Sequence, residues 1–245
     1  MGDLRPRSAA PRGQHFLRPR VAADLVRNSG VTRGDLVVEF GAGNGVLTNE
    51  LASRARRVIA IEIDGRLVSG LRSRFVRSGH VRVVQADALD VSLPREPFRV
   101  VANLPFAHAT PILRRLLDDP AGPLLRADVV VQWGAAVKRC SQRPSTLQTI
   151  SWTPWFEFTL TRRLAASCFL PPPSVDAAVM TITRRPDPLL KPDERPAFVA
   201  FLRSRFGRPG GGTFDVWDWT RRFADGTRPT RQARRRATTR HRRSR

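Results

Sequence analysis

Short apolar runs alternate with helical patterns along the first two thirds of the chain. Runs rich in valine and isoleucine predict strands at Leu36–Phe40, Val58–Glu62, Val81–Gln85, Arg99–Asn103 and Ala127–Gln132. Around them, apolar residues recur every three or four positions, which predicts helices over 19–29 and near Val46–Arg54, Gly65–Val76, Thr110–Asp118 and Gly134–Ser141. This alternation is typical of a doubly wound parallel sheet with right-handed crossovers and helices on both faces.

Two later apolar runs break the alternation. Trp155–Thr161 and Val175–Thr183 follow each other with no long helix between them, so we expect an antiparallel pair at the edge of the sheet. The predicted fold class is therefore α/β, a Rossmann-like sheet with an antiparallel edge.

Composition divides the chain into four parts. Residues 1–18 form a flexible basic arm, and 19–185 form the α/β domain. Residues 186–225 are expected to form a small, mainly helical C-terminal domain, with helices at Pro196–Phe206 and Val216–Phe223. Residues 226–245 are rich in arginine and poor in apolar groups, which predicts a disordered tail.

The bulk composition indicates an ordinary globular protein. Hydrophobic residues make up 41% of the 245, enough for a core, and no apolar run approaches the roughly 20 residues of a membrane span. The first residues lack the apolar segment of a secretory signal, so we expect a soluble, cytoplasmic protein. The two cysteines, Cys140 and Cys168, lack metal-ligand spacing, so no metal site is expected.

The net charge of +22 indicates a polyanionic partner. Nine arginines and no acidic residue fall within 226–245. Arginine binds phosphate with two hydrogen bonds, and release of counterions then drives association, so RNA or DNA is the expected partner. An arginine-rich genome whose charges are simply solvated is the alternative.

A glycine-rich turn, Glu39–Gly45, lies between the first predicted strand and the following helix. Gly41 and Gly43 allow a tight turn and the close approach of a nucleotide-like ligand. The spacing is GxGxG, which differs from pyrophosphate-binding turns and from the P-loop. Glu39 beside the turn would repel phosphate but suits the cationic methionine part of S-adenosylmethionine. A dinucleotide site or a purely structural turn is the alternative.

Two acidic residues end the next two strands. Glu62 is placed to accept hydrogen bonds from both hydroxyls of a ribose. Asp87 is placed to accept from an adenine amine, and the backbone of Ala88 to donate to the ring. Ligands of open α/β sheets bind at these strand ends, although either acid alone is equally consistent with a solvated carboxylate.

The fourth predicted strand ends in Asn103-Leu104-Pro105-Phe106. The Asn103 side-chain oxygen and the Leu104 carbonyl can accept the two hydrogens of an exocyclic adenine amine, which aims its lone pair at a sulfonium methyl group. Pro105 fixes the backbone, and Phe106 offers a face on which an extruded base stacks. Positioning supplies most of the acceleration, so no strong general base is needed. An ordinary turn is the alternative.

At these motifs the chain resembles the ribosomal RNA adenine dimethyltransferase family, and within it the Erm group. The resemblance covers roughly residues 12–184, through Gly13–Leu17, Glu39–Gly45, Glu62, Asp87, Asn103–Phe106 and Phe169–Val175. It implies a class I methyltransferase fold and S-adenosylmethionine as cofactor. It also implies that the first motif wraps the cofactor with Gln14, His15 and Leu17, that Gly41, Glu62, Asp87 and Asn103 hold it, and that Phe169 faces the target base opposite Phe106.

The resemblance implies N6-methylation, once or twice, of an adenine in the peptidyl transferase region of 23S ribosomal RNA. Resistance to macrolide, lincosamide and streptogramin B antibiotics would follow, because the methyl groups occupy space that the drugs need. We expect a monomer that acts before or during subunit assembly. Position 15 is more often Asn in the family, and the residues after 185 look less regular than the usual C-terminal domain.

Three alternatives compete with this interpretation. The housekeeping enzyme for small-subunit RNA usually has tyrosine where Phe106 stands, and this difference and the basic tail favour the Erm group. A non-catalytic nucleic-acid-binding relative would not need the intact Asn103–Phe106 loop. An NAD-dependent dehydrogenase lacks a well-placed catalytic His or Tyr, and the chain contains no tyrosine.

Overall fold

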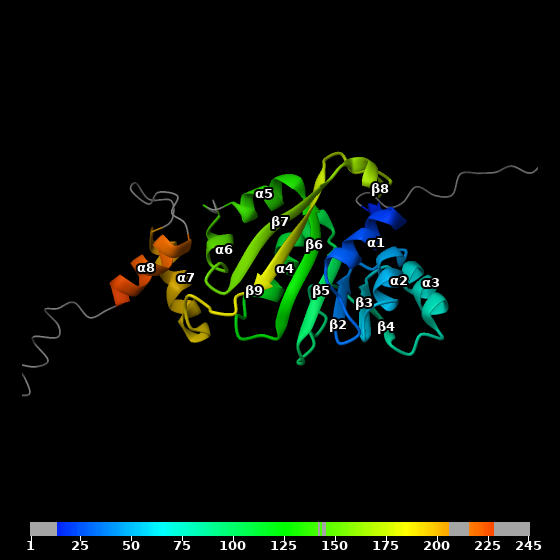
Figure 1. Ribbon diagram of the computed structural model, residues 1–245, viewed down its shortest axis with the longest axis horizontal. Coiled ribbons are helices and arrows are strands. Elements are labelled where there is room, and N and C mark those ends of the chain that lie inside the picture. Colours follow the sequence, from blue (N-terminus) through cyan, green and yellow to red (C-terminus); the bar gives the residue numbers. More distant parts are fainter. Residues whose placement is uncertain (1–13, 142, 144–145, 206–215, 228–245) are drawn as a thin grey trace, which may run out of the picture.

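A seven-stranded mixed sheet forms the centre of the computed structural model (Figure 1), which describes residues 14–141, 143, 146–205 and 216–227. The strand order is β4-β3-β2-β5-β6-β9-β7. The strands are β2 (Leu36–Phe40), β3 (Arg57–Glu62), β4 (Val81–Gln85), β5 (Phe98–Asn103), β6 (Leu124–Gln132), β7 (Phe156–Leu164) and β9 (Ala177–Arg184). Strands β2 to β6 are parallel, and β9 runs antiparallel between β6 and β7, as predicted for the edge.

Helices pack on both faces of the sheet (Figure 1). The helices of the described residues are α1 (Pro19–Asn28), α2 (Val46–Ala52), α3 (Gly65–Phe75), α4 (Ala109–Leu117), α5 (Trp133–Cys140), α6 (Leu147–Ile150), α7 (Arg195–Arg205) and α8 (Val216–Thr227), with short 3-10 helices at Phe106–His108, Ala166–Cys168 and Pro192–Glu194. Of these, α7 and α8 lie beyond the edge of the sheet (Figure 1). Strand residues alternate between the two faces: Val37 packs with α1 and α2, whereas Val38 packs with α4. The doubly wound α/β fold is thereby confirmed.

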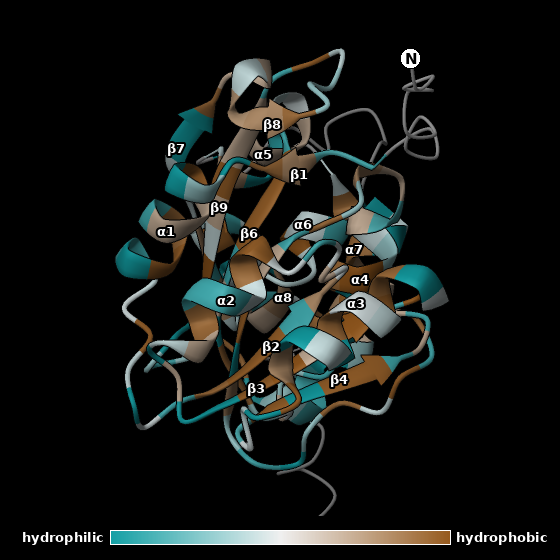
Figure 2. Cartoon of the chain, turned by 90° about the vertical axis from the view of Figure 1, so that its right-hand side faces the viewer, coloured by the Kyte–Doolittle hydropathy of each residue, from teal (hydrophilic) through white to brown (hydrophobic). Residues whose placement is uncertain are grey.

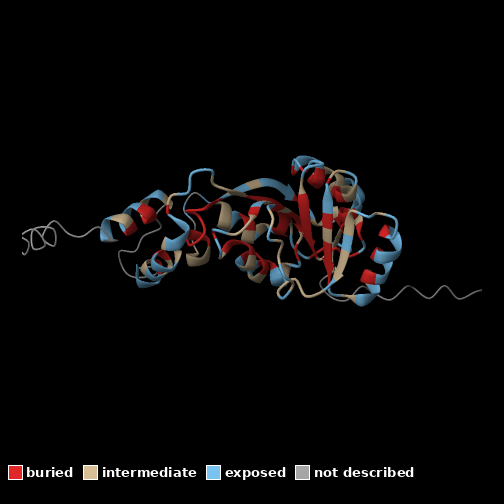
Figure 3. Ribbon diagram, turned by 90° about the horizontal axis from the view of Figure 1, so that it is seen from below, coloured by how far each residue is buried: buried red, intermediate tan, exposed pale blue. Residues whose placement is uncertain are grey.

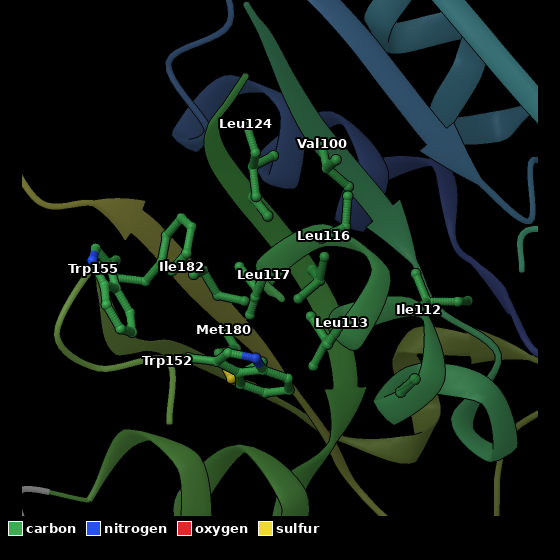
Figure 4. Packing of buried hydrophobic residues seen from close by; sticks show 14 of the residues in the cluster. Val100, Ile112, Leu113, Leu116, Leu117, Leu124, Trp152, Trp155, Met180 and Ile182 are labelled. Atoms are coloured by element: carbon green, nitrogen blue, oxygen red, sulfur yellow. The ribbon is translucent and has the colours of Figure 1, made fainter. Parts of the chain in front are cut away.

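The largest buried cluster lies beneath α4 and is rich in aromatic side chains. Trp152 and Trp155 are fully buried there beside Leu117, Met180 and Ile182 (Figure 4). Trp152 donates its indole N–H to Asp118, and Trp155 donates its own to the backbone oxygen of Leu190, each at 2.8 Å. Each indole therefore keeps a hydrogen-bond partner while its ring is removed from water.

The segment expected to be a flexible arm is ordered from Gln14 onward. Strand β1 (Phe16–Leu17) pairs antiparallel with β8 (Phe169–Leu170), far away in the sequence (Figure 2). The Arg18 amide continues the pairing by donating to the Cys168 oxygen at 2.9 Å. The predicted arm of residues 1–18 is therefore too long, because a two-residue strand carries no periodic signal. Residues 1–13 lie outside the described part of the chain.

The two C-terminal helices share their core with the sheet. Phe198 of α7 packs edge-on against Trp155 and against Phe223 of α8, with ring centroids 6.3 and 5.4 Å apart. All three belong to the same buried cluster as the sheet, and the outer faces of the helices are exposed (Figure 3). The residues predicted as a separate domain thus form an extension of one core. Helix α8 continues to Thr227, past the predicted start of the tail, and 228–245 lie outside the described residues.

Within the described residues, no helix is both long and apolar enough to span a membrane.

Candidate active site

A cavity of about 690 Å³ opens at the carboxyl ends of the parallel strands, within the usual range of small-molecule sites. It brings together most of the residues singled out in the sequence: Gln14, His15, Gly41, Gly43, Glu62, Asp87, Ala88, Asn103, Leu104, Pro105 and Phe106. Leu17, Glu39 and Phe169 are not among its lining residues. Strand ends that are adjacent in the sheet but distant in sequence thus form one site.

The glycine turn follows β2 and adopts backbone conformations that other residues rarely tolerate. Gly41 and Gly43 have φ angles of 70° and 57°. A Cβ atom on Gly43 would lie 2.6 Å from the ring of Phe16, so only glycine fits beneath that ring. A Cβ on Gly41 would lie 3.5 Å from Pro105, so the turn directly adjoins the Asn103–Phe106 loop.

The carboxylate of Glu62 is held by backbone amides at the end of β3. Its Oε2 accepts from Gly43 at 2.8 Å, and its Oε1 accepts from Ile63 and Asp64 at 2.9 and 3.0 Å. A carboxylate offers about four acceptor positions. About one remains, on Oε2, so the geometry leaves room for one ribose hydroxyl where we expected two.

Asp87 lies just beyond β4 in the cavity wall. Its Oδ1 accepts from the Leu89 amide at 2.7 Å, which fixes the side chain in a local turn. No described residue donates to Oδ2. This oxygen fits the expected role of accepting a hydrogen bond from an adenine amine.

Glu39 has a different environment from the one its position suggested. It is buried in β2 and accepts a hydrogen bond from the Thr48 hydroxyl at 2.6 Å. Burial raises the pKa of Glu39 from 4.5 to about 8; the Thr48 hydrogen bond opposes this rise and the nearby Glu62 adds to it. The side chain is therefore largely protonated at neutral pH, and it does not provide the negative charge that we expected for a cationic ligand.

Asn103 ends β5, partly buried in the cavity wall. Its Nδ2 donates to the backbone oxygen of His15 at 2.7 Å. Because a carbonyl oxygen only accepts, this bond determines which end of the amide faces His15. The other end, Oδ1, is buried and has no hydrogen-bond partner among the described residues. Such an orphaned acceptor costs about 1–3 kcal/mol, which a ligand N–H would recover.

The two phenylalanines expected to sandwich a base do not lie parallel. Phe106 is partly exposed in the cavity, whereas Phe169 is fully buried in β8. Their ring centroids are 6.5 Å apart and their planes are inclined by 76°. Of these two rings, Phe106 lines the cavity and the buried Phe169 supports it edge-on.

His15 holds the N-terminal motif against the cavity wall. Its Nδ1 donates to the Pro171 oxygen at 3.0 Å, and its ring lies 6.2 Å from that of Phe106. The hydrogen bond from Asn103 uses only the backbone of residue 15, so His can stand where Asn is more usual. Leu17, expected to touch the cofactor, is instead buried in β1.

Several apolar lining residues were missed in the sequence. Ile63 is 63% exposed although it is large and apolar, and it adjoins the cavity beside Glu62. Its position directly after the strand-end carboxylate of Glu62 could have indicated a place in the cavity wall. Phe16 and Pro173–Val175 belong to motifs that the resemblance used, but they were given no role there; they line the cavity beside the pairing of β1 with β8.

No group of His, Cys, Asp and Glu side chains within the described ranges is arranged to hold a metal ion.

Comparisons with known proteins agree with the motifs. The rRNA adenine N-6-methyltransferase of Bacillus licheniformis is 33% identical over 176 residues, which is 71% of this chain and 61% of that protein. The mycinamicin-resistance protein MyrB of Micromonospora griseorubida is 36% identical over 203 residues, covering 82% of this chain and 63% of that protein. The chain therefore spans less than two thirds of the length of either relative.

A solved structure and a family model complete the assignment. The crystal structure of the 23S rRNA methyltransferase ErmE matches with a TM-score of 0.73 at 32% identity, covering 82% of this chain and 83% of that one. The sequence model of the ribosomal RNA adenine dimethylase family matches residues 10–210. The resemblance to Erm-type enzymes is thereby confirmed, and the chain belongs to the ribosomal RNA adenine dimethylase family.

Proposed function

We propose that this protein transfers methyl groups from S-adenosylmethionine to N6 of an adenine in the peptidyl transferase region of 23S ribosomal RNA. The observation that carries the proposal is the buried Oδ1 of Asn103, an acceptor without a donor among the described residues, in the wall of the cavity. An amide oxygen at that place matches an N–H of an exocyclic adenine amine.

The lining residues fit the methyl donor. Glu62 accepts from a ribose hydroxyl, Asp87 accepts from the amine of the donor's adenine, and the Gly41 turn lets the ligand approach the backbone. S-adenosylmethionine, when bound, supplies an electrophilic methyl group on a sulfonium. The apolar Ile63 beside Glu62 provides a surface for the flat adenine ring.

The loop after β5 positions the target amine. Asn103 Oδ1 and the Leu104 carbonyl each accept one amine hydrogen, which directs the nitrogen lone pair away from them and toward the methyl group. Leu104 is held in place because its side chain is buried and its amide donates to the Val130 oxygen at 3.1 Å. Phe106 stacks against the extruded base. The proton leaves to solvent after alkylation, since the alkylated nitrogen is acidic.

Two features favour large-subunit RNA as the target. The matches include MyrB, whose name records resistance, and ErmE, whose name records 23S RNA. Phe106 stands where the housekeeping enzymes usually carry tyrosine.

The product would confer resistance to macrolide, lincosamide and streptogramin B antibiotics. The enzyme would act in the cytoplasm as a monomer on RNA that is not yet fully assembled.

Primer extension on both ribosomal RNAs tests the target. Purified protein is incubated with S-adenosylmethionine and naked 23S and 16S RNA, or with assembled subunits. We expect labelled methyl groups to enter 23S RNA, more on naked RNA than on assembled subunits, and a stop at one adenine of the peptidyl transferase region where two methyl groups are added. Methylation confined to 16S RNA would instead assign the protein to the housekeeping reaction.

A further inference from the structure

A second cavity, of about 420 Å³, adjoins the first. It is lined by Gln132, Trp133, Gly134, Arg163, Val175 and Asp176. Gln132 and Val175 line both cavities, so the two are neighbours at the end of β6 and just before β9. The proposed chemistry uses none of these six residues.

An arginine stacked on an indole forms the wall of this second cavity. The guanidinium carbon of Arg163 lies 4.8 Å from the ring centroid of Trp133. The same guanidinium donates to Asp176 Oδ2 from Nε at 2.9 Å and contacts it from its terminal nitrogen at 2.7 Å. The Trp133 backbone amide donates to the backbone oxygen of Asp176 at 2.9 Å. The indole against one face and the carboxylate bonded to the guanidinium nitrogens together fix the guanidinium plane, while the Arg163 side chain remains 61% exposed.

The chemistry of this wall suits a nucleobase better than a phosphate. Asp176 already offsets the charge of Arg163 and would repel an anion. A guanidinium plane and an indole both stack on bases, and the exposed Val175 adds apolar surface at the rim. A base next to an extruded adenine has lost a stacking partner, and a fixed plane nearby would replace it.

We propose that the second cavity binds the nucleobase adjacent to the target adenine, stacked on the Trp133–Arg163 pair. The inference rests on the proposed function, because it requires the target adenine to lie at Asn103. It makes Trp133 and Arg163 residues that bind substrate RNA and leave the methyl donor untouched.

The test combines enzyme variants with modified RNA. The substrate is a short fragment of the peptidyl transferase loop, intact or with an abasic nucleotide on either side of the target adenine. Trp133→Ala and Arg163→Ala are compared with Trp133→Phe, which keeps a ring, and with Arg162→Ala. Arg162 is the matched control, because it is the neighbouring arginine, 46% exposed, and pairs with Asp24 away from both cavities.

We expect Trp133→Ala and Arg163→Ala to raise the KM for intact RNA about tenfold, the effect of removing one base stack, with the Kd for S-adenosylmethionine unchanged. One of the two abasic RNAs should raise the KM of the wild-type enzyme by the same factor. On that RNA, Trp133→Ala and Arg163→Ala should raise the KM no further. Trp133→Phe and Arg162→Ala should stay near wild type.

Two results would overturn this inference and leave the proposed function standing. One is an equal KM of the wild-type enzyme for the intact and both abasic RNAs. The other is a rise in KM that multiplies when a variant enzyme is combined with an abasic RNA. A wild-type protein that does not methylate the intact fragment would overturn the proposed function itself. Thermal unfolding of each variant identifies any that fail to fold, and the exposed Arg163 keeps the test decisive if Trp133→Ala is one of them.

Discussion

The side-chain amide of Asn103 donates to the backbone carbonyl of His15 at 2.7 Å, across 88 residues of sequence. This hydrogen bond joins the loop that we propose binds the target amine to the N-terminal segment that lines the cavity. It also leaves the Asn103 oxygen without a partner among the described residues, which is the basis of the proposed chemistry.

Asn103→Ala should lower kcat by at least about 100-fold, a loss of the size seen when one preorganised group of a transition state is removed. Asn103→Asp should be similarly impaired, because a carboxylate cannot donate to the His15 oxygen and would face it with like charge. Single-turnover methylation measures the rate, and calorimetry measures binding of S-adenosylmethionine. An Asn103→Ala enzyme with normal turnover would remove Asn103 from the mechanism.

Phe106→Ala should reduce turnover on RNA more than it reduces affinity for S-adenosylmethionine. Loss of one stacked base corresponds to about 10- to 100-fold in kcat/KM. Phe106→Tyr is the matched control, because it keeps the aromatic face and should retain most activity. Equal losses in RNA turnover and cofactor affinity would contradict a role confined to the base.

Removing residues 1–18 should abolish binding of S-adenosylmethionine and lower the melting temperature. The truncation deletes β1, the acceptor of the Asn103 hydrogen bond, and the cover of the buried Phe169. Removing residues 1–13 alone should leave cofactor binding unchanged, since the described lining of the cavity begins at Gln14. Calorimetry and thermal unfolding compare the two proteins; the same behaviour from both would refute this role for β1.

Glu39→Gln should make stability less dependent on pH. Burial raises the pKa of Glu39 to about 8, so between pH 4.5 and 8 the folded protein binds more protons than the unfolded chain. The free energy of unfolding therefore falls as pH rises through that window, by at most about 1.4 kcal/mol per pH unit. Glutamine still accepts from Thr48 but does not titrate.

Urea unfolding from pH 5 to 9 measures this difference. The variant should gain stability relative to the wild type as the pH rises, and its affinity for S-adenosylmethionine should not change. Parallel stability profiles would show that Glu39 does not titrate as proposed.

Deleting residues 228–245 should weaken RNA binding and flatten its salt dependence. Helix α8 ends at Thr227, so this cut leaves the described core intact, and it removes nine arginines. Each phosphate that the tail no longer neutralises reduces the steepness of log K against log salt by about 0.7–0.9. Filter binding between 50 and 200 mM salt measures the slope of log K against log salt. An unchanged slope would assign the tail no role in binding RNA.

The sheet and the strand-end residues could be predicted because their signals are local. Glu62 and Asp87 follow apolar runs that form strands in any context, and parallel strands place their carboxyl ends at one edge. Glu39 was also open to a correct interpretation. Glu39 lies inside a strand that is buried on both faces, so its side chain was to be expected in the core and not at the turn that follows.

The pairing of β1 with β8 could not be predicted. Leu17 and Phe169 lie opposite each other across a two-residue ladder that joins segments far apart in the chain. Each residue belongs to a conspicuous motif, and for that reason we expected each to contact a ligand in the cavity. The two motifs instead pack against each other and bury Leu17 and Phe169. Pro173–Val175 follow β8 and line the cavity, and Val175 also lines the second cavity.

A crystal structure with a non-reactive analogue of the methyl donor and adenosine monophosphate tests the central claim most directly. The measured quantities are the distances from the adenine N6 to Asn103 Oδ1 and to the Leu104 oxygen. We predict both at about 2.7–3.2 Å, with the donor at the Gly41 turn on the opposite side of N6. A donor and an adenine that face apart, or an adenine bound away from Asn103, would contradict the account.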